Sequence, residues 1–486
     1  MISLWSRRPL TMAAAFIAVL TAWRILALAT SDLDLFFDEA QYWFWSLDPA
    51  FGYFSKPPMV AWLIGAGTAL FGNTEFAVRL ASPICYAITA ALGAGIAWTI
   101  YAETAFQRAA AAWTAITLAT LPAISLSAQL ASTDVALLMF WAAALLCLVR
   151  YWRFGGLWWA GFGLAFGAGL MSKYAMIYML LCLPVALVLV PEMRPLLRTA
   201  GLWLGILLGL LLFLPNVWWN WTHELAAFSH TAANANWSGP LLKPHKLAEF
   251  AGAQFGIMGP ILLVAFAWAA VRWRRLATGD RVLLAFGLPV LLLMLAQALV
   301  SRAHANWAAV SYIAATVLVV GWLLRQEQGR WLRRSLALHI AVAVAILYGA
   351  SLAPLTGTDP WHRMRGWHEM GVEVKARLAE RPDAMLMVSD RAGMAALLFY
   401  VRPAPPAWIK LRKGEAAGDH YELVSEATSI GTRPVLYLSR WGRADQVPDD
   451  LGRRFETVTP TAPLSRLRPT RPPEVYNAFW LEGFKG

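Results

Sequence analysis

The sequence predicts a mostly α-helical, polytopic membrane protein with about eleven transmembrane helices and a small α/β domain at its C-terminus. Three observations support this fold class. Of the 486 residues, 59% are hydrophobic and 14% charged, whereas soluble domains average roughly 45–50% apolar and about 25% charged residues. Apolar runs of bilayer length recur along residues 1–352. Half of all charged residues lie in residues 353–486, which we expect to form the separate soluble domain.

The first apolar run differs from a cleavable signal peptide. Residues 10–30 approach the ~20 residues that a spanning helix needs, and Arg7 and Arg8 precede them. We therefore expect an uncleaved first span, and a window of about 19 residues finds the others. The predicted limits are 10–30, 76–100, 109–129, 134–149, 156–171, 174–190, 199–215, 256–271, 281–299, 305–324 and 335–352.

The arginines predict the orientation of the spans. With Arg7 and Arg8 in the cytoplasm, alternation puts all the arginine-rich connections on the same side, where positively charged connections are expected. These connections are 101–108, 150–153, 192–198, 272–281 and 325–334. The unusual polar residues then gather on the exoplasmic face, together with everything after residue 353.

The C-terminal segment has a different composition. It holds 19 Lys and Arg and 16 Asp and Glu, and no run of bilayer length. Alternating strands and helices indicate a small α/β layer. The predicted elements are an amphipathic helix at 359–381, a strand at 385–390, a helix at 393–401, a strand at 434–440 and an extended surface strap at 466–473. The segment lacks a glycine-rich phosphate-binding motif, which argues against a nucleotide-driven pump or a nucleotide-sugar enzyme.

The first outer loop, residues 32–59, is the most informative segment. It sets several carboxylates and a lysine among Phe, Trp and Tyr, the residues typical of a bilayer interface. Residues 38–47 are predicted to form an interfacial helix on which Asp38 and Tyr42 share a face. Lys56 precedes two prolines, which favour an extended backbone. Adjacent acids and a lysine can supply a general base and an anion-binding group; the alternative is a loop of solvated charges.

Further polar residues are predicted on the same face. Asp134 begins the fourth span, where it can cap the helix or support catalysis. Lys173 lies between two spans, where it can extend its ammonium to the interface or bind an anion. The connection 301–307 is rich in hydrogen-bond donors for a turn between apolar helices, which favours ligand binding. Its candidate residues are Arg302, His304, Asn306 and Trp307.

Metal and nucleic-acid binding are not indicated. The connection 216–255 contains His223, Glu224 and His230, without the tight spacing of a metal motif such as HExxH. The three cysteines lie within apolar runs and have no metal-site spacing. The net charge of +12 comes from basic residues beside the spans, so we expect no nucleic-acid partner.

Several of these segments carry a resemblance to a known family. The order of these segments, their spacing and their shared position on the exoplasmic face are similar to those of the GT-C superfamily of integral-membrane glycosyltransferases. Residues 1–352 resemble bacterial relatives of the protein O-mannosyltransferases and of the lipid A aminoarabinose transferase, and residues 361–370 resemble lipid A uronosyltransferases. The matching segments of the membrane portion are FDEAQYW (37–43), YFSKPPM (53–59), FG..EFAVRL (71–80), STD (132–134), MSKY (171–174) and HANW (304–307).

The resemblance implies transfer of a sugar from a polyprenyl phosphate to an exoplasmic acceptor, with inversion. Lipid A or another envelope glycan is the favoured acceptor. Negative charge builds on the departing phosphate and needs fixed cations, while the acceptor hydroxyl must lose a proton to a carboxylate. The expected catalytic carboxylates are Asp38 as base, with Glu39 and Asp134 orienting it or the acceptor. The expected phosphate-binding cations are Lys56, Lys173 and Arg302, and the expected sugar or acceptor contacts are Tyr42, Tyr53, His304, Asn306 and Trp307.

Alternatives remain open at this point. A transporter or flippase of lipid-linked sugars is expected to show internal repeats, and the sequence has no convincing repeat. A protein O-glycosyltransferase and a membrane-anchored binding protein are the others. A divalent cation held by Asp38 and Glu39 is an option that Lys56 would make unnecessary. We expect a monomer of the bacterial inner membrane, surrounded by membrane lipids, with its active site and C-terminal domain on the periplasmic face.

Overall fold

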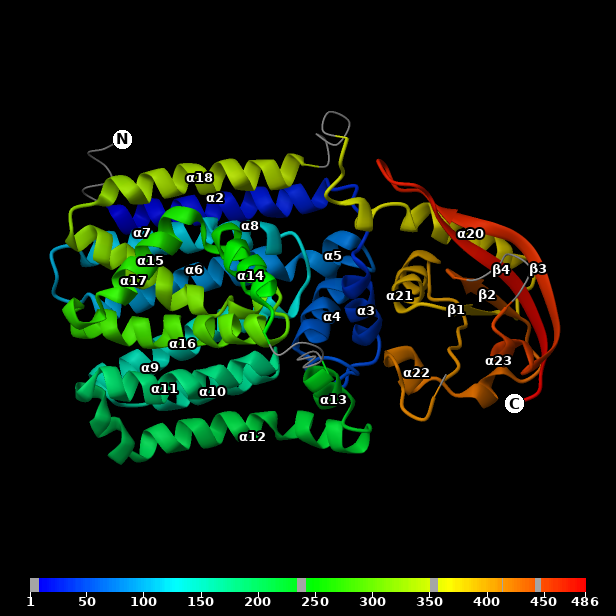
Figure 1. Cartoon of the computed structure of the whole chain (residues 1–486), viewed down its shortest axis with the longest axis horizontal. Helices are drawn as coiled ribbons and strands as arrows, with labels where there is room; N and C mark the ends of the chain where they lie inside the picture. The colour runs from blue at the N-terminus through cyan, green and yellow to red at the C-terminus, as the bar shows by residue number, and fades with distance from the viewer. Residues whose placement is uncertain (1–7, 234–241, 350–356, 413, 442–446) are drawn as a thin grey trace.

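A computed structural model describes residues 8–233, 242–349, 357–412, 414–441 and 447–486. The molecule is elongated, with a bundle of helices that run along its length and a smaller sheet-containing part at one end of the bundle (Figure 1). The predicted domain boundary after residue 352 lies outside the described residues, and so does Arg7.

The bundle contains eleven main helices in the described part of the chain, and each overlaps one predicted span. They are α2 (Pro9–Ala29), α6 (Ala81–Ile100), α7 (Gln107–Thr120), α9 (Thr133–Phe154), α10 (Trp158–Leu170), α11 (Tyr178–Leu189), α12 (Ala200–Thr222), α15 (Pro260–Val271), α16 (Thr278–Val300), α17 (Ser311–Arg325) and α18 (Gly329–Tyr348).

Six helices among the described residues are long and apolar enough to cross a bilayer. They are α2, the α5–α6 pair, α9, α12, α16 and α18. The pair α14–α15, bent by 112°, would make a seventh. A mostly helical protein with several membrane spans is therefore confirmed, whereas the count of eleven crossings stays a prediction.

Shorter helices connect these elements. The α-helices are α3 (Phe37–Ser46), α4 (Met59–Phe71), α5 (Glu75–Arg79), α8 (Pro122–Ser127), α13 (Ala226–Ala233) and α14 (Pro244–Met258). The 3-10 helices are η1 (Tyr174–Ile177), η2 (Pro191–Arg198), η3 (Trp273–Arg275) and η4 (Ala305–Ala308). The helix α3 begins one residue before the predicted interfacial helix and lies between the bundle and the C-terminal domain (Figure 1).

Small residues let two bundle helices approach closely. The helices α10 and α12 face each other through two G-x-x-x-G patterns, Gly163 with Gly167 and Gly205 with Gly209. A Cβ atom on Gly163 would lie 2.5 Å from the Gly205 carbonyl oxygen. Membrane helices commonly associate through such small-residue faces, because apolar side chains alone gain little from leaving lipid.

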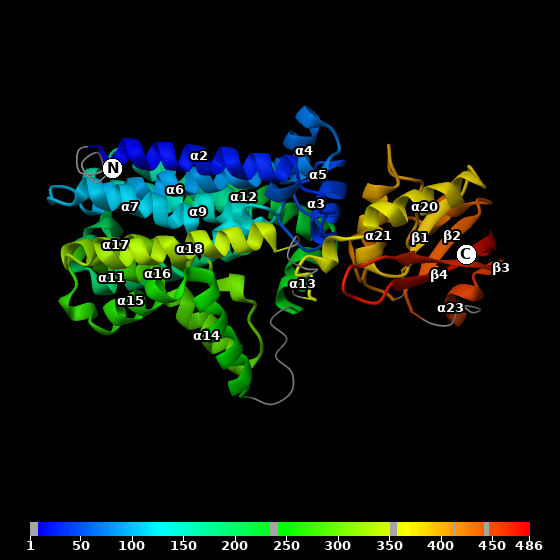
Figure 2. The ribbon, with the colours of Figure 1, turned by 90° about the horizontal axis from the view of Figure 1, so that it is seen from above.

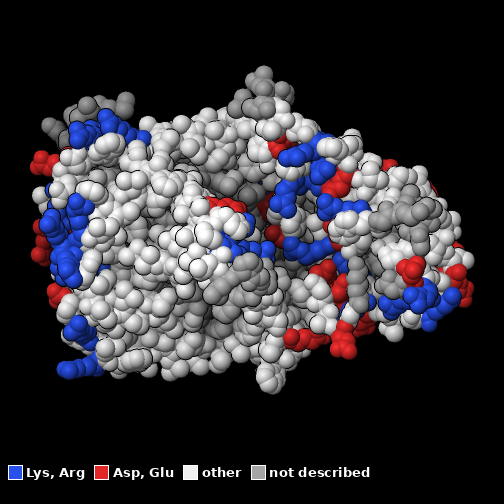
Figure 3. All heavy atoms as spheres, viewed as in Figure 1, with Lys and Arg blue, Asp and Glu red and all other residues white. Residues whose placement is uncertain are grey.

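Charge is distributed as a membrane protein requires. Figure 3 shows an almost uncharged surface over the middle of the bundle, with Lys and Arg gathered at the end remote from the C-terminal domain. The connections α6–α7, α9–α10 and α17–α18 turn at that end (Figures 1 and 2). The arginine-rich connections thus share one end, and the first outer loop lies at the other.

The C-terminal domain is an α/β layer, as predicted. Its elements are η5 (His362–Met364), α20 (Trp367–Ala379), β1 (Met385–Val388), α21 (Arg391–Tyr400), α22 (His420–Val424), η6 (Ala427–Ile430), β2 (Val435–Ser439), α23 (Asp449–Gly452), β3 (Phe455–Arg466) and β4 (Glu474–Phe484). The strand order is β1-β2-β4-β3, with β1 and β2 parallel and β4 antiparallel to both of its neighbours. The predicted strands correspond to β1 and β2, and the predicted helix at 393–401 to α21.

The predicted strap at 466–473 lies at the surface, but it is not an extended segment. Arg466 ends β3, and residues 467–473 turn the chain into β4; the sequence pattern did not indicate these two long antiparallel strands. The strand β3 lies at the edge of the sheet, carries Pro460 and Pro463, and is mostly exposed. Prolines are tolerated in strands at sheet edges. A strand that contains prolines and lacks alternation of apolar and polar residues is not predicted from its sequence pattern.

The C-terminal domain and the first outer loop share one hydrophobic core. Trp43 packs edge-on against Phe399, with ring centroids 4.8 Å apart. The Tyr400 hydroxyl accepts a hydrogen bond of 2.7 Å from the Leu35 amide. Figures 1 and 2 show α21 beside α3. The helix that carries Asp38 is therefore held between the membrane bundle and the C-terminal domain.

Candidate active site

Three of the predicted site residues, Lys56, Lys173 and Trp307, line a cavity at the end of the bundle that faces the C-terminal domain. The cavity has a volume of about 400 Å³, within the range of ligand sites. Its polar lining includes Lys56 and Lys173. Residues of α11 and α16 form the apolar part of its lining on the side of the bundle. The apolar lining residues include Ile177, Tyr178, Leu293, Met294 and Trp307.

Asp134 is held by two of the predicted residues. The Lys173 ammonium donates to one carboxylate oxygen at 2.7 Å, and the Asn306 amide donates to the other at 2.6 Å. Asp134 lies in the first turn of α9, Lys173 precedes η1 and Asn306 lies in η4, so the three come from distant parts of the sequence. The fold thus brings together three residues that were predicted separately.

Lys56 lies in the turn between α3 and α4. Tyr53 and Lys56 exchange backbone hydrogen bonds of 3.1 and 3.3 Å, which close the turn. The Lys56 ammonium makes no hydrogen bond or ion pair within the described residues. Burial, and then the nearby Lys173, lower the pKa of Lys56 from 10.5 to about 8. A half-buried ammonium without a fixed partner among the described residues is suited to binding an anion.

Asp38 lies at the start of α3 and is partly exposed. Its carboxylate forms an ion pair of 3.0 Å with the guanidinium of Arg391, which lies at the start of α21 in the C-terminal domain. Arg391 also donates to the Gln41 side-chain carbonyl at 3.0 Å and lies over the Phe37 ring. Sequence reasoning missed Arg391, because nothing in the sequence links a residue of the C-terminal domain to the first outer loop.

Glu39 occupies a different environment from its neighbour. Its side chain is 1% exposed and pairs with Arg79 of α5 through two hydrogen bonds of 3.0 and 2.8 Å. The amides of Phe36 and Ala131 also donate to it, each at 2.8 Å. Four donors use all the acceptor sites of a carboxylate. Glu39 therefore ties α3, α5 and the start of α9 together, and it has no oxygen left to share a metal ion with Asp38.

Loss of this buried pair is expected to destabilise the protein. Glu39→Gln leaves the Arg79 charge buried without its partner, which typically costs about 3–5 kcal/mol. We expect the thermal unfolding midpoint in detergent to fall clearly. Glu75→Gln is a matched control, because Glu75 forms a partly exposed ion pair with Arg402, and exposed pairs contribute about 0–1 kcal/mol. Equal midpoints for the two variants would contradict the structural role of Glu39.

The two tyrosines predicted to contact substrate differ. Tyr42 is buried on α3, and burial followed by the charge of Asp38 raises its pKa well above 10. Tyr53 is 3% exposed, and its ring stacks on Trp45 at 4.7 Å. Its hydroxyl donates to the Trp45 carbonyl at 2.8 Å and accepts from the Ala50 amide at 3.1 Å. Tyr53 therefore shapes the outer loop, and the structure does not bring it to the cavity surface.

The connection before α17 reaches the same region. Trp307 lines the cavity, and the His304 ring packs edge-on against it at 5.2 Å. Partial burial, followed by the charges of Arg302, Lys173 and Lys56, lowers the pKa of His304. Arg302 is exposed at the edge of this cluster.

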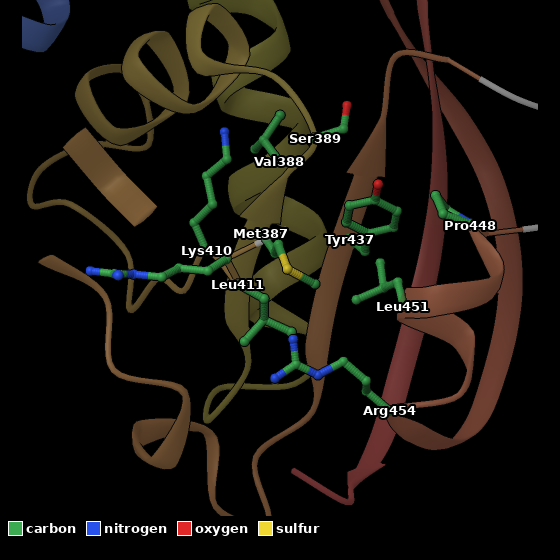
Figure 4. Close-up of a pocket in the computed structure, with 10 residues that line it drawn as sticks. Met387, Val388, Ser389, Lys410, Leu411, Tyr437, Pro448, Leu451 and Arg454 are labelled. Carbon is green, nitrogen blue, oxygen red and sulfur yellow. The ribbon is translucent and has the colours of Figure 1, made fainter. Parts of the chain in front are cut away.

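A second cavity lies in the C-terminal domain, among β1, β2 and α23 (Figure 4). Its volume of about 150 Å³ is below the usual range of ligand sites. Lys410 points away from Arg454 and pairs with Asp419 at 2.7 Å (Figure 4). The cavity therefore does not suit a nucleotide. Within the described part of the chain, no three His, Cys, Asp or Glu side chains converge as metal ligands would.

The sequence and the fold both match known proteins. Residues 55–219 match the family described as dolichyl-phosphate-mannose-protein mannosyltransferase. Lipid A galacturonosyltransferase RgtD of Rhizobium johnstonii is 36% identical over 389 residues, covering 78% of this chain and 80% of that protein. ArnT of Cupriavidus metallidurans in the apo state has a TM-score of 0.59 at 18% identity, covering 96% of this chain and 97% of ArnT. ArnT bound to undecaprenyl phosphate matches with the same score and coverage at 17% identity.

Proposed function

The chain belongs to the GT-C family of membrane glycosyltransferases, and on this premise we propose that it transfers a sugar from a polyprenyl phosphate to lipid A or a related glycolipid. The name of the R. johnstonii relative favours a uronic acid as the sugar. That ArnT has been crystallised with undecaprenyl phosphate favours a polyprenyl carrier.

The cavity is the observation that carries this proposal. Its two lysines can bind a phosphate, and its apolar wall along α11 and α16 can accept the first isoprene units of the carrier. An enzyme for a soluble nucleotide-sugar would not need a polar site continuous with apolar bundle helices. Lys56 is the main phosphate ligand in this proposal, with Lys173 beside it.

The reaction is a direct displacement. An acceptor hydroxyl oxygen attacks the anomeric carbon, the bond from that carbon to the phosphate oxygen breaks, and polyprenyl phosphate leaves with the electron pair. The hydroxyl proton passes to Asp38, whose partly exposed carboxylate can reach an incoming acceptor. Lys56 offsets the charge that develops on the departing phosphate. One displacement from the opposite face inverts the anomeric centre.

The other residues position these groups. Asp134, fixed by Lys173 and Asn306, orients the lysine towards the cavity. Trp307 provides a flat ring face for the sugar at the cavity rim, and His304 packs edge-on against that ring. Glu39 holds α3 in place and does not react in this proposal. The proposed site needs no residue from a second copy, and we propose a monomer as the catalytic unit.

Transfer can be tested with purified protein in nanodiscs. The assay supplies a polyprenyl-phosphate uronic acid and lipid A, and mass spectrometry detects the modified lipid A and the released polyprenyl phosphate. A flippase would move the donor across the bilayer without consuming it. Lipid A that stays unmodified, with the donor intact, would refute the proposed function.

The orientation in the membrane is a separate prediction. The arginine-rich connections lie at one end of the molecule and the C-terminal domain at the other (Figure 3), so we place the site and residues 353–486 in the periplasm. A reporter enzyme that works only outside the cytoplasm should be active when fused after Gly486. The matched fusion within the α17–α18 connection should be inactive. The opposite pattern would reverse the topology and separate the site from a periplasmic acceptor.

A further inference from the structure

We propose that Arg391 of the C-terminal domain is the residue that selects a uronic acid donor, by exchanging the Asp38 carboxylate for the sugar carboxylate. This inference rests on the proposed function and adds to it a residue from outside the membrane bundle. When the donor is bound, Arg391 would hold the sugar and leave Asp38 free to accept the acceptor proton.

The charges around the site match a donor with two negative charges. Lys173 and Arg391 act on the charge of Lys56, Arg302 acts with the two lysines on His304, and two carboxylates oppose these four cations. The cations are Lys56, Lys173, Arg302 and Arg391, and the carboxylates are Asp38 and Asp134. Glu39 does not enter this balance because Arg79 neutralises it. A polyprenyl-phosphate uronic acid carries one charge on the phosphodiester and one on the sugar, whereas a neutral hexose leaves one cation unmatched.

Among these cations, Arg391 is the best placed to bind the sugar carboxylate. Lys56 and Lys173 line the cavity and suit the phosphate. Arg391 is close enough to lower the pKa of both Lys56 and His230, so its charge acts on the cavity from the side of the C-terminal domain. A guanidinium also presents paired N–H groups in the geometry that a carboxylate accepts.

The existing contacts of Arg391 are easily replaced. One terminal nitrogen contacts Asp38 and the other contacts Gln41, so neither partner receives a paired contact. The side chains of Arg391 and Asp38 are 36% and 35% exposed. Ion pairs exposed to this extent contribute little to stability. A sugar carboxylate that offers two oxygens can therefore displace Asp38 at small cost.

This exchange would couple substrate choice to catalysis. With a neutral donor, Arg391 keeps its contact with Asp38 and occupies one oxygen of the base. With a uronic acid donor, the same guanidinium binds the sugar and both oxygens of Asp38 become available. The C-terminal domain then contributes directly to specificity, since α21 begins at Arg391 and packs on α3.

The test compares two donors on the full-length protein in nanodiscs. Polyprenyl-phosphate galacturonic acid and polyprenyl-phosphate galactose differ only in the carboxylate at carbon 6. We expect Arg391→Gln to lower kcat/KM for the uronic acid donor by roughly 10- to 100-fold, the usual value of a charged hydrogen bond, and to leave the galactose donor unchanged or faster. Arg391→Lys should keep part of the preference.

Arg402→Gln is the matched control. Arg402 also crosses from the C-terminal domain to the membrane portion, where it pairs with Glu75 of α5 at 2.7 Å with similar exposure. It should not change the ratio of the two donors. An equal loss of kcat/KM with both donors in Arg391→Gln would overturn the inference. The inference would also fail if Arg302→Gln, and not Arg391→Gln, removed the preference for the uronic acid donor. In either case the wild type still transfers the sugar, whereas a wild type that modifies lipid A with neither donor refutes the proposed function itself.

Discussion

Replacing Asp38 with asparagine is expected to reduce sugar transfer by roughly 10²–10⁴-fold, the usual contribution of general acid–base catalysis. Asparagine keeps the size of the side chain and can still contact Arg391, but it cannot accept the proton of the acceptor hydroxyl. Binding of free polyprenyl phosphate should change much less, because Lys56 and Lys173, and not Asp38, line the donor cavity. Turnover and lipid affinity measured on the same preparation separate the two effects.

The neighbouring carboxylate provides the control. Glu39→Gln should lose activity only to the extent that it loses folded protein, since both Glu39 oxygens are occupied by Arg79 and two backbone amides. Activity is therefore compared per folded molecule, at a temperature below both unfolding midpoints. If Asp38→Asn keeps more than about a tenth of the wild-type activity while well-folded Glu39→Gln keeps none, the two roles are reversed.

Only the family resemblance assigned the base to Asp38, because helix geometry in the sequence could not separate Asp38 from Glu39. Successive residues of a helix point about 100° apart, so one neighbour can face a cavity while the other is buried. Which one is buried depends on Arg79, forty positions away in the chain. The motif segment 71–80 contains this arginine, yet an arginine beside a predicted span is also a common topology signal.

The membrane bundle was largely predictable because its signal is local. Apolar runs and arginine-rich connections are read directly from consecutive residues, and each predicted range overlaps a helix of the structure. The predicted membrane orientation placed Asp134, Lys173 and Asn306 on the same face of the bundle. Their mutual contacts in the structure agree with that placement. Arg391 could not be found in this way, because its role depends on how the C-terminal domain packs on α3.

Replacing Lys56 with methionine is expected to weaken binding of free polyprenyl phosphate by roughly 10- to 100-fold, as the loss of a charged hydrogen bond implies. Transfer should slow as well, since the same contact strengthens as charge moves onto the departing phosphate. Lys56→Arg should rescue only part of the loss, because a planar guanidinium does not replace a compact ammonium in a closed turn. Unchanged lipid affinity in Lys56→Met would exclude this role and leave Lys173 or Arg302 as the phosphate ligand.

The pH dependence tests the same contact independently. Burial lowers the pKa of Lys56 to about 8, and only the protonated ammonium attracts the phosphate. Affinity should therefore be fully present below pH 8 and fall as the pH rises through that value, by up to about tenfold per pH unit, because binding must then take up a proton. Lys56→Arg stays charged and should lose this dependence, and Lys56→Met should be weak at every pH. A wild-type affinity that stays constant between pH 7 and about pH 10 would mean that the ammonium of Lys56 does not hold the phosphate.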